Sequence, residues 1–194
     1  MVAPAGLLLF HGAGGDRDHR LFLALEAASS LPVARCNFPY RDRGPGRRPP
    51  DRMPKLLESV RGHANRCSAE WGVPLEALVL GGRSLGGRAA SLAVADGLPA
   101  AGLLLLSYPL HPPGKHESLR TEHFGRLHLP VLLVQGRSDP FGTQTEFDAH
   151  TPALPGPFDQ VWLDKTGHDP AAKHDATIVA AVGEWFWRLT ASAD

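Results

Sequence analysis

The chain has 194 residues, of which 43% are hydrophobic and 21% are charged, and its formal net charge is +0. This length fits a single domain over residues 1–194 with a sizeable core. Because the net charge is balanced, the chain as a whole is not attracted electrostatically to nucleic acid or to an acidic membrane surface, and we expect neither as a partner. Two cysteines, Cys36 and Cys67, lack the CxxC spacing of a zinc or redox site and are too few for a disulfide framework. We expect them to be core thiols in a reducing compartment.

The N-terminal stretch over residues 2–10 is apolar but short, and no basic segment precedes it. It therefore predicts neither a secretory signal nor a membrane span, and we expect a cytoplasmic protein.

Short apolar runs alternate with longer stretches of helical periodicity along the chain. This alternation is typical of βαβ units, so it predicts an α/β fold with a mainly parallel sheet flanked by helices. In chain order, the six predicted strands cover residues 6–11, 33–38, 77–81, 102–107, 131–135 and 160–163.

Three helices are predicted from apolar periodicity. The first carries its apolar face from Met53 to Cys67, with Pro54 in the first turn, where proline is tolerated. The second runs from Leu85 to about Asp96 and ends before Gly97, and the third begins near Asp175.

A loop rich in proline, glycine and arginine is predicted over residues 40–54, after the second strand. Loops at the carboxyl ends of parallel strands surround the binding crevice. The arginines of this loop therefore either border the substrate or form a solvated basic surface, and the sequence leaves both open: Arg41, Arg43, Arg47, Arg48 and Arg52.

The motif Gly82-Arg83-Ser84-Leu85-Gly86 directly follows the third predicted strand and directly precedes a helix. This is the context of a nucleophile elbow, in which a strained turn lifts a serine Oγ above the sheet. We expect Ser84 to be the nucleophile and the N–H of Leu85 to be one oxyanion-hole donor. A tight connection or a phosphate cradle is the alternative, although no P-loop pattern is present.

Two later loops supply the partners that a serine nucleophile needs. Asp139 follows the fifth strand and His168 follows the last one, so both lie at the same edge of a parallel sheet as Ser84. The order Ser, Asp, His matches that of α/β-hydrolases. We expect His168 to be the general base and Asp139 to orient it. Asp148, in a predicted helix, and Asp164, close to the His168 loop, are weaker candidates for the acid.

The first strand ends in the His-Gly-rich loop His11-Gly12-Ala13-Gly14. Such a loop donates the second oxyanion-hole N–H, and we assign this donor to Ala13. Gly12 and Gly14 are neighbouring alternatives for the donor, and a glycine turn with no catalytic role is the structural alternative. We expect His11, Gly12 and Arg83 to contact the substrate.

No metal or cofactor is expected. The remaining histidines of the segment after the fourth strand match no helical zinc signature: His111, His116, His123 and His128.

With these residues assembled, the sequence resembles the α/β-hydrolase superfamily over nearly its whole length. More specifically, it resembles the small hydrolase-like family of testis-expressed protein 30 and its bacterial relatives, which is similar to the dienelactone hydrolases. The motifs that carry the likeness lie at residues 10–14, 37–40, 81–87, 107–115 and 135–142, and the run Tyr108-Pro109-Leu110-His111-Pro112-Pro113-Gly114-Lys115 is the most distinctive.

The resemblance implies a three-layer α/β-hydrolase fold that starts at the third strand of larger members. A helix, a strand and a loop already occupy the chain between Ser84 and Asp139, so no cap domain and an open pocket are expected. An open site and a Ser-His-Asp triad favour a carboxylesterase or thioesterase that cleaves a small ester or thioester through an acyl-serine intermediate, as a monomer or homodimer. One branch of the family is similar to a non-enzymatic subunit of a histone acetyltransferase complex, so an inactive binding or scaffold module is the alternative.

Overall fold

The computed structural model describes residues 2–42 and 48–192. Arg43 and Arg47 of the predicted arginine-rich loop lie outside these residues. No helix in the described ranges is long and apolar enough to cross a membrane.

Six strands form one sheet in the order β2-β1-β3-β4-β5-β6, and every neighbouring pair is parallel. The strands are β1 (Gly6–Phe10), β2 (Val33–Cys36), β3 (Leu78–Arg83), β4 (Gly102–Leu106), β5 (Val131–Gly136) and β6 (Phe158–Leu163). All six predicted strands are confirmed, with ends that shift by a few residues. Four central strands are apolar on both faces, as a sheet covered on both sides requires.

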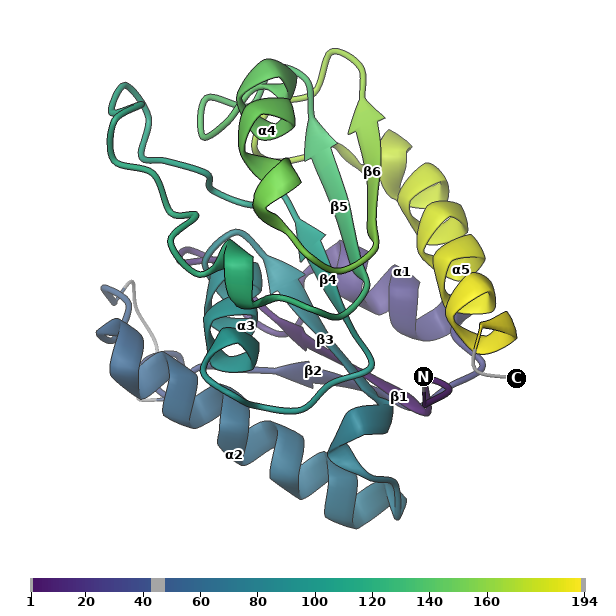
Figure 1. Ribbon diagram of the computed structural model, residues 1–194. Coiled ribbons are helices and arrows are strands. Elements are labelled where there is room, and N and C mark those ends of the chain that lie inside the picture. Colours follow the sequence, from purple (N-terminus) through teal and green to yellow (C-terminus); the bar gives the residue numbers. More distant parts are fainter. Residues whose placement is uncertain (1, 43–47, 193–194) are drawn as a thin grey trace.

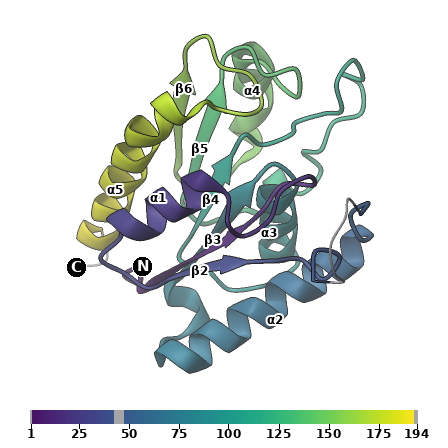
Figure 2. The same ribbon diagram turned by 180° about the vertical axis from the view of Figure 1, so that it is seen from behind.

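Helices cover both faces of the sheet and complete three layers (Figures 1 and 2). They are α1 (Arg20–Ala28), α2 (Met53–Trp71), α3 (Leu85–Ala95), α4 (Gln144–His150) and α5 (Asp175–Ala191). One buried cluster lies under α2, α3 and α4, and a second lies under α1 and α5. The described chain carries no separate cap domain, so this is the α/β-hydrolase fold that the sequence predicts.

The helix α1 was not predicted. Its apolar residues Leu21, Phe22 and Leu25 face the core, but its N-cap is His19, whose ring Nδ1 accepts a hydrogen bond from the Leu21 N–H. Histidine is not among the usual N-cap residues, so the sequence carries no strong start signal there.

The order of the strands determines where a site can form. The chain moves from β1 outward to β2, then returns across β1 to β3 and continues in the opposite direction. At such a switch point the loops after the two central strands diverge and leave a crevice at the carboxyl edge. Here those loops are the His-Gly-rich loop after β1 and the Ser84 turn after β3.

Both cysteines are free thiols within the core on the α2 side of the sheet. The expectation that Cys36 and Cys67 are core residues is confirmed.

Candidate active site

Ser84 occupies the sharp turn between β3 and α3. Its backbone has φ 51° and ψ −113°, a conformation that L-residues rarely adopt and that costs free energy. Its N–H donates to the Leu106 carbonyl at 2.8 Å, and its carbonyl accepts from the Arg88 N–H at 3.0 Å. The strained turn is therefore held from the neighbouring strand and from the helix that follows.

Two glycines make this turn possible because the first strand passes very close to it. A Cβ placed on Gly82 would lie 2.1 Å from the Phe10 carbonyl oxygen, and one on Gly86 would lie 1.9 Å from the same atom. Both distances are far inside van der Waals contact with backbone. Small residues two before and two after Ser84 are thus a steric requirement, as the motif predicts.

The structure brings Ser84, His168 and Asp139 together from three loops. His168 Nε2 lies 2.8 Å from Ser84 Oγ, and His168 Nδ1 lies 2.8 Å from Asp139 Oδ2. The Asp139 side chain is fully buried, whereas that of His168 is 20% exposed. A buried carboxylate on Nδ1 favours the tautomer in which Nε2 can accept a proton from the serine hydroxyl.

Asp139 is fixed by donors other than His168. Gln135 Nε2 donates to Asp139 Oδ2 at 2.6 Å, and the Phe141 N–H donates to Oδ1 at 2.8 Å. Gln135 is fully buried at the end of β5 and also donates to the Tyr108 carbonyl. Sequence reasoning assigned Gln135 no role, although a polar residue ending a buried strand four positions before the acid was a signal.

His168 is held from two sides. The Phe141 ring stacks on its imidazole with centroids 4.1 Å apart. Arg83 Nη2 donates to the His168 carbonyl at 3.1 Å and pairs with Asp169 Oδ1 at 2.9 Å. The polar contacts of Arg83 are therefore with the loop that carries His168. The contact between Arg83 and the substrate that the sequence predicts stays a prediction.

The Gly12 and Ala13 carbonyls of the loop after β1 accept hydrogen bonds from neighbouring residues. The Gly12 carbonyl accepts from His11 Nδ1 at 2.8 Å and from the Gly15 N–H at 3.1 Å, and the Ala13 carbonyl accepts from the Tyr40 hydroxyl at 3.1 Å. In a trans peptide the N–H points opposite to the carbonyl, so the N–H of Ala13 is directed away from His11 and Gly15.

Within the described chain, the N–H groups of Ala13 and Leu85 donate no hydrogen bond to protein. Leu85 begins α3, where the first N–H groups lack helical partners and attract negative charge. A Cβ on Gly12 would lie 3.5 Å from Ser84 Cβ, which places the loop directly beside the serine. These are the features that a pair of oxyanion donors needs.

His11 is buried and hydrogen-bonded to neighbouring backbone. Its side chain is 1% exposed, its Nε2 accepts from the Phe38 N–H at 3.1 Å, and burial lowers its pKa. The predicted substrate contact of His11 stays a prediction, while its hydrogen bonds favour a role in shaping the loop. Arg41, from the arginine-rich loop, pairs with Asp16 at 3.2 Å across the same region.

The two weaker candidates for the acid lie elsewhere. Asp164 is 82% exposed and pairs with Arg137 at 2.7 Å. Asp148 lies in α4, as predicted, and accepts from Gln160 Nε2. Neither carboxylate bonds to His168 in the described structure.

This fold and this arrangement of side chains define the class of α/β-hydrolases. The family model described as "Alpha/beta hydrolase domain" matches residues 3–181, and the chain belongs to that family. The finer assignment to the relatives of testis-expressed protein 30 stays a prediction.

Solved structures share the fold at low identity. Est1E from Butyrivibrio proteoclasticus with ferulic acid bound has a TM-score of 0.81 and 15% identity, over 97% of this chain and 90% of that one. A protein of the α/β-hydrolase superfamily from Xanthomonas campestris has a TM-score of 0.68 and 21% identity, over 96% and 99%. SOBER1 from Arabidopsis thaliana has a TM-score of 0.62 and 19% identity, over 96% and 99%.

Proposed function

We propose that this chain is a serine hydrolase that cleaves a small ester or thioester through an acyl-Ser84 intermediate. One observation carries the proposal: the continuous hydrogen-bonded series from Ser84 through His168 to buried Asp139, with both contacts at 2.8 Å. A strained serine at the start of a helix adds support, because a binding module has no physical need for it.

The residues account for each step of the reaction. Ser84 Oγ attacks the carbonyl carbon while His168 Nε2 takes its proton. The oxyanion that forms accepts hydrogen bonds from the N–H groups of Ala13 and Leu85. His168 then returns the proton to the leaving alcohol or thiol, and the acyl group stays on Ser84. A water molecule, deprotonated by His168, attacks the acyl carbon and releases the acid and the free serine.

The experiment is fluorophosphonate labelling of the wild type beside Ser84→Ala and His168→Ala, read by intact mass. We expect one adduct on the wild type and none on either variant. A substrate panel follows, with short p-nitrophenyl esters, acyl thioesters and methyl ferulate, the last because ferulic acid binds to Est1E. A folded wild type that neither labels nor turns over any ester would contradict the proposal and favour an inactive scaffold.

A further inference from the structure

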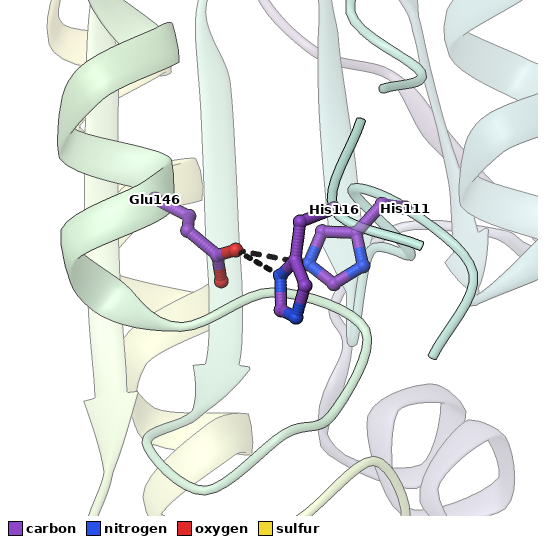
Figure 3. Close-up of side chains that lie close together, drawn as sticks. All are labelled: His111, His116 and Glu146. Atoms are coloured by element: carbon purple, nitrogen blue, oxygen red, sulfur yellow. Dashed lines mark hydrogen bonds and ion pairs between the residues drawn. The ribbon is translucent and has the colours of Figure 1, made fainter. Parts of the chain in front are cut away.

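A cluster of two histidines and a glutamate lies outside the residues of the proposed reaction. His111 and His116 belong to the segment after β4, and Glu146 lies in the first turn of α4 (Figure 3). Glu146 Oε1 is 2.6 Å from His116 Nδ1 and 3.2 Å from His111 Nε2. The three potential ligand atoms all lie within 4.8 Å of one another. Spacing along the sequence did not indicate Glu146, because it lies 30 positions from His116.

His111 is oriented as a metal-ligating histidine is. Its side chain is 1% exposed, and its Nδ1 lies 2.8 Å from the Pro112 carbonyl, to which it can only donate. In the neutral ring that leaves Nε2 with a lone pair, and a backbone carbonyl on the other nitrogen is the usual second contact of a ligand histidine. Nε2 is buried without a hydrogen bond, although the Glu146 carboxylate is close. A lone pair and a carboxylate oxygen at that distance repel unless a proton or a metal ion lies between them, and Nε2 makes no hydrogen bond to the carboxylate.

The capping box of α4 uses only one carboxylate oxygen of Glu146. Its Oε2 accepts from the Thr143 N–H at 2.8 Å and from the Thr143 hydroxyl at 2.7 Å, and thereby completes the capping box of α4. The other oxygen, Oε1, is directed at the two imidazoles and is hydrogen-bonded to His116 Nδ1.

We propose that His111, His116 and Glu146 bind a divalent transition-metal ion, for which zinc is the best match. Zinc takes imidazole nitrogen and carboxylate oxygen at bond lengths near 2.0–2.2 Å, so tetrahedral ligand atoms lie about 3.3 Å apart. The separation of His111 Nε2 from Glu146 Oε1 already fits. His116 needs to withdraw by less than about 1 Å to reach the same spacing, and its side chain is 67% exposed on a loop and free to adjust. Water would take the fourth position.

The ion stabilises the protein rather than touching the reacting atoms. It joins the segment after β4 to the start of α4. The His111 N–H donates to the Phe141 carbonyl at 3.1 Å, and the Phe141 ring stacks on His168. The ion therefore holds in place the segment that contacts Phe141, the residue whose ring packs on His168. This inference does not depend on the proposed hydrolysis.

The test is direct binding of Zn²⁺ to untagged, chelator-treated full-length protein, by isothermal titration calorimetry and by thermal unfolding. We expect one ion per chain and a rise in Tm of about 5 °C or more at a hundredfold excess over Kd. Co²⁺ in place of Zn²⁺ reports coordination through its visible absorption bands, which need no activity.

Variants locate the site. His116→Ala and Glu146→Gln each remove one ligand, and glutamine still serves a capping box, so both should fold. We expect each to weaken Zn²⁺ binding at least tenfold and to abolish most of the Tm rise. His128→Ala, at an exposed histidine outside the cluster, is the matched control and should bind as the wild type does. No one-to-one binding by the wild type, or binding that survives both variants, would overturn the proposal.

Discussion

At the scale of single residues, the contact between Asp139 and His168 is the one on which the proposed chemistry depends most. In Asp139→Asn an amide replaces the carboxylate, so the imidazole loses the acceptor that fixes its tautomer and stabilises its charged form. We expect kcat to fall by about 10⁴-fold while the protein stays folded. Steady-state kinetics on a p-nitrophenyl ester, with circular dichroism for the fold, provides the measurement.

Asp164→Asn is the matched control, since Asp164 is an exposed carboxylate just before the histidine loop that does not bond to His168. It should lose at most the Arg137 ion pair, which is worth little at the surface. Equal losses of activity in the two variants would show that Asp139 is not the orienting acid.

The sequence could predict which three residues meet but not what holds them. Strand ends at one edge of a parallel sheet bring Ser84, Asp139 and His168 together whatever the loop details are. The contacts of Gln135, at the end of β5, and of the Phe141 N–H depend instead on the exact path of the loop that carries Asp139, which no spacing rule encodes. The contacts of Glu146 could not be predicted for a similar reason, because its partners His111 and His116 lie on another loop.

At the scale of elements, prediction succeeded where burial sets the pattern. The strands are apolar runs because both faces of the sheet are covered, and α2 and α5 show one apolar face each. It failed at α1, whose start depends on an uncommon histidine cap. It also stopped β3 two residues early, since the glycines that continue the strand to Arg83 resemble a turn.

The glycines of β3 and α3 lead to a stability prediction. In Gly86→Ala the new methyl group would meet the Phe10 carbonyl at 1.9 Å, so β1 and α3 must separate. We expect a loss of about 3 kcal/mol in the free energy of unfolding. In Gly62→Ala, within α2, the new methyl group meets nothing within 4 Å, and helix propensity should add up to about 1 kcal/mol. Urea denaturation of both variants measures the contrast, and a Gly86→Ala protein as stable as the wild type would contradict the packing described here.

At the scale of the whole molecule, stability against acid should depend on a buried histidine. His123 is fully buried in the segment between β4 and β5, and its Nε2 lies 2.8 Å from Ser91 Oγ of α3. Burial, which is the main cause, lowers the pKa of His123 from 6.5 to about 4. Between these two values the unfolded chain binds a proton that the folded chain does not. The free energy of unfolding therefore falls as the pH drops from about 6.5 to about 4, by up to about 3 kcal/mol from this one group.

His123→Gln isolates that contribution, because the amide can still bond to Ser91 but does not titrate. Buried His11 and half-buried His63 have pKa values lowered in the same direction, mainly by burial, and affect wild type and variant alike. Urea denaturation across this pH range should therefore give a steeper decline for the wild type than for the variant, while the two slopes agree above pH 7. Parallel curves throughout would show that His123 has the same pKa in the folded and the unfolded chain, which would contradict the prediction.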